Sequence, residues 1–547
     1  MKNKIIKLIG GASASAVLAL AATTVSAGAA QTTTTPLAVD CASLQGFTIP
    51  ASAIGLPTKG ARVETAVEVK ASEPRNVSGD FCKVTGIIQN ATDSTAVFEF
   101  QVNLPPQWNG RALQIGGGGY DGSLVAAVGP YTLQPIGRDT PLKSGYITLG
   151  SNGGHRGGPG FDGTFGLDDE ALLNYGKQSI KKTHDVAVAI ANKAYGRAPQ
   201  RFYFIGGSQG GHEALDAAAR YPDDYDGVVA NYPAYNVTLL HLGSWNVGRA
   251  LYADNGAGWM DVAHVKLITD AVMAQCDALD GLADQIIGNV TACNAKFDVK
   301  TLRCANGGAG ERCLSDAQLK AVAAITSDYK PGFSIAGMDT YPRWALLEGA
   351  LFAGRSDFGK TAQPSNPLAG TEPLLYSAGD GTIKFIITRD PKFDTLKFDP
   401  ARYKDRIGVV ASIMDVTDQS LERFRAKGGK ILMTHGTADD FITPHNSIAY
   451  YQRQVAQFGQ QQLDSFLRFY VIPGFGHGFG TFNATYDALP ALQQWVEDGK
   501  APVDLITFDG NLNQSRTRPL CEYPKYPKFV AGAGSETVAG GFACVAP

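Results

Sequence analysis

The sequence has few charged residues, and beyond its first thirty residues it has no long apolar run. A membrane-spanning helix needs about eighteen or more consecutive apolar residues, and no later stretch approaches that length. Only 18% of the residues are charged, the net charge is −3, and no basic run occurs. These absences argue against a membrane anchor in the mature chain and against nucleic-acid or anionic-membrane partners.

A zinc-binding motif is also missing. The eight cysteines form no Cys-x2-Cys pair and no cluster with histidine, so the sequence argues against zinc. They fall instead into four near-neighbour couples: Cys41 with Cys82, Cys276 with Cys293, Cys304 with Cys313, and Cys521 with Cys544. Spacing alone does not fix connectivity, but four local disulfides are the simplest arrangement for a protein in an oxidising compartment.

The first thirty residues have the form of an export signal. Lys2, Lys4 and Lys7 precede an apolar stretch that ends near Ala22, and small residues up to Ala30 fit a cleavage site. The alternative, a retained anchor, is disfavoured because the apolar stretch is too short to cross a bilayer. We therefore expect residues 1–30 to be a signal peptide and the protein to be secreted or periplasmic.

The remaining chain alternates short apolar strands with helices. The pattern predicts strands at 97–102, 112–115, 146–149, 201–205, 227–230, 430–433 and 469–472, and helices at 175–195 and 211–220. Strands that are apolar throughout and alternate with helices are typical of a parallel sheet covered on both faces, an α/β fold. Between about 234 and 415 this alternation fades. We therefore expect a catalytic domain made of 31–233 and 416–547, with 234–415 inserted into it.

A candidate nucleophile follows one of these strands directly. Gly206-x-Ser208-x-Gly210 lies between an apolar strand and a helix, which is the setting of a nucleophile elbow. In proteins with this elbow, the catalytic acid and then the catalytic histidine follow the serine in chain order, each after a late strand. This order selects Asp439, with Asp440 as the alternative acid, and His477 on a glycine-rich loop.

Two backbone N–H groups are needed to stabilise the oxyanion that forms during acyl transfer. We expect one from Gln209, the residue after the nucleophile, and the other from the loop of four glycines that follows strand 112–115, at Gly118 or Gly119. The alternative for this loop is a plain glycine turn.

An acidic segment lies in the inserted region. Asp277, Asp280 and Asp284 surround a glycine, and such oxygen ligands suit calcium. From the charge pattern alone, a calcium site and a solvated acidic loop are equally good interpretations.

Several motifs together give the chain a resemblance to a known family. They are Gly116–Gly122, Ser151–His155, Gly206–Gly211 with Tyr221–Gly227, Cys276–Ile286, His435–Pro444 and Pro473–His477. Over nearly the whole mature chain these segments resemble the tannase and feruloyl esterase family. The resemblance implies an α/β-hydrolase core with a large lid, which is the inserted region 234–415. It also supports the four local disulfides.

The same resemblance implies a structural calcium ion in the lid. Its ligands would be the side chains of Asp277, Asp280 and Asp284 and the carbonyl oxygens of Leu282 and Ile286. It implies as substrates esters of phenolic acids, either galloyl or feruloyl esters, or a terephthalate monoester as in one branch of the family.

The chain departs from the family pattern beside the nucleophile and the histidine. Family members usually have a cysteine before the serine and another after the histidine, joined as a disulfide, whereas this chain has Gly207 and Gly478. We expect packing and the hydrogen bonds of the triad to hold the two loops, which should be more mobile and insensitive to reducing agent at this point.

These observations predict a secreted serine esterase that acts on small-molecule esters of aromatic, phenolic acids through an acyl-enzyme. Trp245, Tyr341, Trp344, Phe352 and Phe358 are candidate pocket walls in the lid, and the alternative is core packing, which is the more common use of aromatic residues at such spacing. One alternative is a broader aromatic esterase acting on terephthalate-type monoesters. The alternative from another class is a non-catalytic, calcium-stabilised binding protein. The acyl group, the alcohol and the oligomeric state stay open.

Overall fold

The computed structural model describes residues 34–158, 161–352, 358–417 and 420–547. The predicted signal peptide, residues 1–30, lies outside these described residues. Residues 34–547 form one compact unit. Within the described part of the chain, no helix has both the length and the apolar character that crossing a membrane requires.

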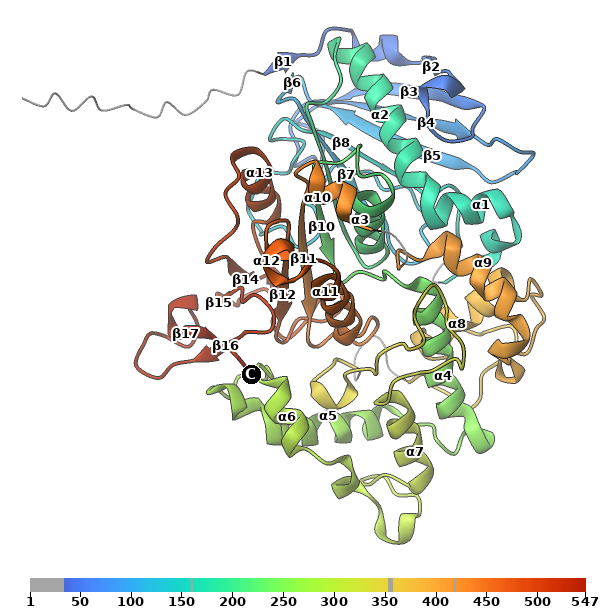
Figure 1. Cartoon of the computed structure of the whole chain (residues 1–547), viewed down its shortest axis with the longest axis vertical. Helices are drawn as coiled ribbons and strands as arrows, with labels where there is room; N and C mark the ends of the chain where they lie inside the picture. The colour runs from blue at the N-terminus through green and yellow to red at the C-terminus, as the bar shows by residue number, and fades with distance from the viewer. Residues whose placement is uncertain (1–33, 159–160, 353–357, 418–419) are drawn as a thin grey trace, which may run out of the picture. The chain divides into compact units, whose positions relative to one another are not determined.

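A ten-stranded mixed sheet forms the centre of this unit (Figure 1). Its strand order is β12-β11-β10-β9-β7-β8-β5-β4-β3-β2. The six strands from β12 to β8 are parallel, whereas β5, β4, β3 and β2 continue the sheet antiparallel. In chain order the strands are β2 (Thr48–Ile49), β3 (Gly60–Val69), β4 (Phe81–Gln89), β5 (Phe98–Leu104), β7 (Arg111–Ile115), β8 (Ile147–Ser151), β9 (Arg201–Gly207), β10 (Gly227–Asn231), β11 (Lys430–Gly436) and β12 (Leu467–Ile472).

Alternate residues of the parallel strands pack into two separate cores, one on each face of the sheet. In β9, Phe202 and Phe204 belong to one core, and Tyr203 and Ile205 belong to the other. This division follows from the strand period of two residues. Helices α2 (Ser179–Tyr195) and α3 (Gln209–Arg220) supply residues to the first core, and α13 (Ala488–Asp498) covers the second. The predicted α/β class, with a sheet covered on both faces, is confirmed.

The described residues between β10 and β11 contain helices and contribute no strand to the main sheet. These helices are α4 (Val237–Gly256), α5 (Val262–Cys276), α6 (Val290–Lys296), α7 (Asp316–Ile325), α8 (Leu374–Gly381), α9 (Lys404–Met414) and α10 (Glu422–Ala426). Helix α4 packs against α7, α8 and α9, and α4 to α7 lie in the lower part of Figure 1. The assignment of 234–415 as a separate lid domain stays a prediction.

The remaining elements complete the unit. Helix α1 (Asp169–Leu173) precedes α2, and both α11 (Pro444–Phe458) and α12 (Gln460–Asp464) lie in the connection between β11 and β12. Strand β1 (Thr35–Pro36) pairs with β6 (Gln107–Trp108). The C-terminal part forms two small antiparallel sheets from β13 (Ala484–Thr485), β14 (Ile506–Asp509), β15 (Thr517–Pro519), β16 (Tyr526–Phe529) and β17 (Phe542–Val545).

All four predicted disulfides are present, and the described residues contain no free cysteine. The predicted strands also occur, with ends that differ by a few residues. Three strands of the main sheet, β2, β3 and β4, were not predicted from the sequence pattern. Strand β3 has a register shift between Val63 and Thr65, and this irregularity breaks the two-residue alternation by which a strand is recognised.

Candidate active site

Ser208 lies at the sharp turn between β9 and α3. Its φ of 61° and ψ of −120° are rarely adopted by a residue other than glycine. The neighbouring glycines allow this turn, since a Cβ atom at Gly206 would lie only 2.3 Å from the carbonyl oxygen of Gly210. The strained turn places the hydroxyl at the N-terminus of a helix, as the elbow motif predicts.

The side chains of Ser208, His477 and Asp439 form a continuous hydrogen-bonded chain. Nε2 of His477 lies 2.9 Å from Oγ of Ser208, and Nδ1 of His477 lies 2.9 Å from Oδ2 of Asp439. The three residues follow β9, β12 and β11, so the parallel sheet brings their loops to one edge. The alternative acid, Asp440, is also buried, but it is Asp439 that contacts His477.

Asp439 is fully buried, and protein groups form hydrogen bonds with its carboxylate. Its Oδ1 accepts hydrogen bonds from the N–H groups of Phe441 and Ile442, both at 2.9 Å. Burial alone would raise the pKa of Asp439, but the imidazoles of His477 and His435 hold that pKa below its ordinary value. The carboxylate is therefore ionised, and it can orient His477 and stabilise a positive charge on it.

The loops that carry the acid and the base are joined by backbone hydrogen bonds. Ala438 N–H donates to the carbonyl of Phe475 at 2.9 Å, and Thr437 N–H donates to that of Ile472 at 3.0 Å. The elbow is tied to β10 instead, because Ser208 N–H donates to the carbonyl of Asn231 at 3.1 Å.

The residues predicted to form an oxyanion hole lie on the open side of the glycine loop. A Cβ atom at Gly118 or Gly119 would meet no atom within 4 Å, so this face of the loop is accessible. The N–H of Gln209 is in the first turn of α3, where no acceptor exists within the helix. The carbonyl of Gly117 accepts the N–H of Gly210 at 3.0 Å, which fixes the loop against the elbow.

A buried pair of carboxyl groups, which sequence reasoning missed, lies against the same glycine loop. Glu213 on α3 accepts the N–H of Gly117 at 2.9 Å, and its side chain is also bonded to Asp121. Burial raises the pKa of Asp121 to about 7 and raises the pKa of Glu213 well above its ordinary value. Two carboxyl groups in contact share a proton, so this pair holds one negative charge at most near neutral pH.

Aromatic rings extend outward from His477. Phe441 packs edge-on against the imidazole, with 5.3 Å between ring centroids, and Phe161 stacks on Phe441 at 5.2 Å. Phe161 also lines a cavity of about 710 Å³ together with Asp162, Gly381 and Lys384. This volume is within the range of small-molecule pockets.

The aromatic residues proposed from sequence as lid walls do not line this cavity. Trp245, Tyr341, Trp344, Phe352 and Phe358 are all buried in the main core. Their hydrophobic faces pack between helices, and that use of an aromatic side chain cannot be told from pocket lining by sequence position alone. Trp344 contacts the backbone of Phe441 from the core, since its Nε1 donates a hydrogen bond to the carbonyl of Phe441 at 3.3 Å.

The acidic loop after α5 has the features expected of a cation site. Asp280 accepts the N–H groups of Leu282 and Gly288, and burial together with the nearby carboxylates of Asp284 and Asp277 raises the pKa of Asp280 to about 7. Within the described residues, no hydrogen bond ends on the carbonyl oxygens of Leu282 and Ile286. One cation is already close, because Arg518 binds Asp284 at 2.8 Å.

The donor set therefore fits a hard divalent ion. Among the described residues, Asp284 is the one carboxylate of the three with an arginine ion pair, and the carbonyl oxygens of Leu282 and Ile286 accept no hydrogen bond. In the described structure the ligand oxygens of Asp277, Asp280 and Asp284 do not all lie within 4.8 Å of one another.

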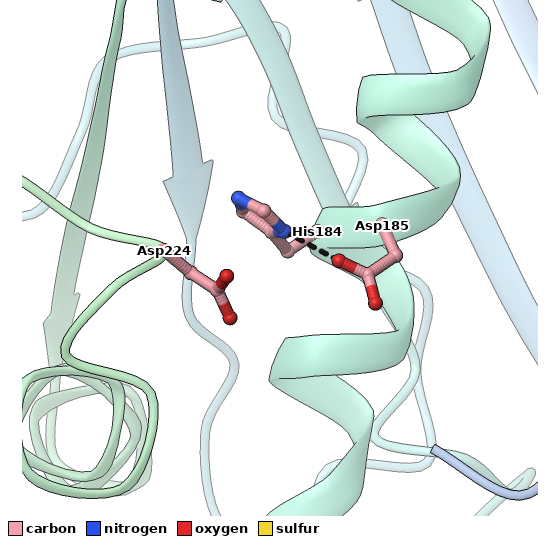
Figure 2. A group of neighbouring side chains, drawn as sticks. All are labelled: His184, Asp185 and Asp224. Carbon is pink, nitrogen blue, oxygen red and sulfur yellow. Dashed lines mark hydrogen bonds and ion pairs between the residues drawn. The ribbon is translucent and has the colours of Figure 1, made fainter. Parts of the chain in front are cut away.

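A second group of potential metal ligands lies on α2, away from the acidic loop. Figure 2 shows His184 and Asp185 on this helix facing Asp224 across a gap, with ligand atoms within 4.8 Å of one another. Lys181 supplies the positive charge at this site, because its Nζ forms ion pairs with Asp185 at 2.7 Å and with Asp224 at 3.0 Å. The lysine neutralises the carboxylates, so this cluster is a structural ion-pair network.

Three comparisons place the chain among known proteins. Residues 82–545 match the family model "Tannase and feruloyl esterase". An uncharacterized esterase of Agrobacterium fabrum is 36% identical over 518 residues, which cover 92% of each chain. A mono(2-hydroxyethyl) terephthalate hydrolase of Piscinibacter sakaiensis is 31% identical over 550 residues, covering 88% of this chain and 89% of that protein. The crystal structure of feruloyl esterase B from Aspergillus oryzae superposes with a TM-score of 0.73 at 25% identity, covering 92% of this chain and 99% of that one.

Proposed function

The chain belongs to the tannase and feruloyl esterase family of carboxylic ester hydrolases, and we propose that it cleaves esters with a Ser208–His477–Asp439 triad. The observation that carries this proposal is the hydrogen-bonded chain from Ser208 Oγ through His477 to Asp439, with both contacts at 2.9 Å. A structural histidine needs no contact with a strained serine at a helix N-terminus. This geometry favours an enzyme over a silent binding protein.

The reaction proceeds in two halves. His477 Nε2 takes the proton of Ser208 as Oγ attacks the ester carbonyl, and the N–H of Gln209 and of the Gly118–Gly119 segment stabilise the oxyanion. His477 then protonates the leaving alcohol, which leaves an acyl-enzyme. Water attacks this intermediate with the same proton transfers and releases the acid. Asp439 keeps the imidazole oriented and stabilises its positive charge throughout.

The substrate class is an ester of an aromatic, phenolic acid. Phe441 and Phe161 form a stacked aromatic wall between His477 and the neighbouring cavity, which supports a planar acyl group. A broader activity on terephthalate monoesters is the second candidate, favoured by the relative that is named as a mono(2-hydroxyethyl) terephthalate hydrolase.

Initial rates on methyl gallate, methyl ferulate, chlorogenate and a terephthalate monoester separate these candidates. We expect turnover of at least one substrate, lost in Ser208→Ala, and labelling of the wild-type protein by a serine-directed phosphonate. Labelling without turnover of any of the four esters would overturn the aromatic-acid assignment and leave the hydrolase intact. Failure of both would favour a binding protein.

We also propose that the acidic loop holds a structural calcium ion and that the protein is exported. Asp277, Asp280 and Asp284, with the carbonyls of Leu282 and Ile286, would hold the ion, whose charge compensates the carboxylates that Arg518 leaves unpaired. Titration calorimetry of chelator-treated protein with Ca²⁺ tests binding directly, and Asp280→Asn should weaken it. The four disulfides support an oxidising destination.

A further inference from the structure

Tyr232 lies where β10 ends, directly opposite the loop that carries His477. Its N–H donates to the carbonyl of Thr434 at 2.6 Å, so its backbone is anchored to the neighbouring strand β11. Its φ of +34° lies in the left-handed region, which a bulky residue rarely adopts. The side chain is 7% exposed. The surrounding structure therefore holds this tyrosine in one unusual conformation.

The phenol end of Tyr232 fills the space between the nucleophile loop and the histidine loop. A Cβ atom at Gly207, the residue before Ser208, would lie 2.6 Å from both Cζ and Oη of Tyr232. A Cβ atom at Gly478, the residue after His477, would lie 3.4 Å from the same Oη. An added side chain at 207 would therefore overlap the ring, and it would also overlap Thr132, whose Cγ2 lies 2.9 Å from the same Cβ position.

The same ring also contacts the imidazole. The ring centroids of Tyr232 and His477 are 4.9 Å apart at an angle of 60°, an edge-to-face arrangement, and Phe475 lies 5.9 Å away in the same loop. The histidine loop is tied to the acid loop by backbone hydrogen bonds, and the nucleophile loop is tied to β10. None of these backbone hydrogen bonds joins the Ser208 loop to the His477 loop. Tyr232 packs between these two loops.

We propose that Tyr232 is the positioning residue that keeps Ser208 and His477 in register. It lies between the two positions where the family pattern puts cysteines, and Gly207 leaves room for its ring, whereas a Cβ atom at Gly478 would only contact its Oη. This inference rests on the proposed triad. Its consequence is that the register of the two loops depends on packing of one aromatic ring and not on the redox state of a thiol pair.

The position of Tyr232 determines how a disulfide between residues 207 and 478 can be introduced. Cysteines installed at 207 and 478 alone would collide with Tyr232, so failure to form a bond would say nothing about the register of the loops. The two Cβ positions lie close to one phenolic oxygen, and a disulfide needs a Cβ–Cβ separation of about 3.5–4.5 Å. Removing the ring clears Oη from between the two positions, while the Cγ2 atom of Thr132, 2.9 Å from the Cβ position at 207, still has to shift.

Three variants test the positioning role: Tyr232→Phe, Tyr232→Leu and Tyr232→Ala. The matched control is Tyr195→Ala, which removes an equally buried tyrosine that packs on Trp108 at 4.7 Å. We expect Tyr232→Phe to keep kcat within about threefold, because the ring remains. Tyr232→Ala should lower kcat and the rate of phosphonate labelling by roughly 10–100-fold with KM within about threefold, since a misplacement of about 1 Å can cost that much.

Tyr195→Ala should lower Tm and leave kcat unchanged. Tyr232→Leu keeps much of the side-chain volume. It replaces the alanine variant in the comparison of kcat if Tyr232→Ala does not fold. A core-filling role alone predicts that the Tyr232 variants lower Tm with kcat intact, and that result overturns the inference. If the wild-type protein itself fails to react with the phosphonate, the proposed triad is wrong, which is a different outcome.

Rescue gives the second readout. The triple variant Tyr232→Ala, Gly207→Cys, Gly478→Cys should recover at least about tenfold in kcat when oxidised and lose it on reduction, whereas the wild-type rate should not respond to reductant. Because Gly478 has a φ of +82°, Gly478→Ala in the Tyr232→Ala background serves as the control for backbone strain. A bond that forms, as shown by thiol titration, without any recovery of kcat would count against the positioning role.

Discussion

The buried carboxyl pair beneath the glycine loop should make the protein less stable as the pH rises, and Glu213→Gln should reduce this effect. Glu213 is 6% exposed and accepts the N–H of Gly117, while its carboxyl contacts Asp121. Glutamine has the same shape. Its carbonyl oxygen can accept the same N–H, and its amide can donate to Asp121 without a shared proton.

The effect involves both groups: burial raises the pKa of Asp121 from 3.8 to about 7, and burial together with the charge of Asp121 raises the pKa of Glu213 well above its ordinary value. The folded protein therefore keeps a proton that the unfolded chain has already lost, so the pair stabilises most below about pH 4 and loses that contribution as the pH rises through about 7. At about 1.4 kcal/mol per pH unit the raised pKa of Asp121 alone corresponds to about 4 kcal/mol, and its burial remains when Glu213 is replaced. Allowing for relaxation, we expect Glu213→Gln to add about 1–3 kcal/mol to the free energy of unfolding at about pH 8.5 and almost nothing at about pH 4.5.

Urea unfolding of both proteins at these two pH values measures the difference. The control is Glu170→Gln, another buried glutamate, whose pKa is lowered. Burial would raise the pKa of Glu170, but hydrogen bonds from Thr92 and from the N–H of Ala91 outweigh it. Its ionised form stabilises the fold, so Glu170→Gln should destabilise at high pH. A gain from Glu213→Gln that is equal at both pH values would refute the shared-proton reasoning.

Other predictions concern the triad, the calcium ion and the disulfides. Asp439→Asn should lower kcat by roughly 10³–10⁴-fold with little change in KM, because the imidazole loses its orienting carboxylate; a loss below tenfold in steady-state assays would point to a different acid. Dialysis against EGTA should lower Tm by several degrees in calorimetry, with recovery on adding Ca²⁺ but not Mg²⁺. Replacing Cys41 and Cys82 by serine should reduce the free energy of unfolding by about 1 kcal/mol more than replacing Cys304 and Cys313, because the closed loops span 41 and 9 residues. The reverse order in urea unfolding would argue against an entropic origin.

The parts of the site that could be predicted are those in which the chemistry lies within a few residues. The elbow around Ser208 requires glycines beside the serine because a Cβ atom there would overlap backbone, and this requirement is visible in the sequence. The disulfide couples are equally local, with at most 41 residues between partners. The chain order of serine, acid and histidine then restricts the remaining candidates to two loops.

Other parts depend on contacts between distant segments. Glu213 meets Asp121 across 92 positions of the chain, and Phe161 stacks on Phe441 from a different part of the fold. No periodicity marks such pairs. The candidate walls in the insertion follow the core alternative for the same reason, since burial in a helical core and exposure in a pocket both favour aromatic residues.

The glycines at 207 and 478 show where this division lies. The sequence by itself established the α/β class, the elbow, the triad candidates and the loss of a cysteine pair, because backbone sterics and covalent bonding act locally. Only the tertiary structure decided what replaces that pair. Tyr232 reaches both glycines because parallel strands bring the ends of β9, β10 and β12 to one edge of the sheet, and side-chain packing there is decided by the fold as a whole.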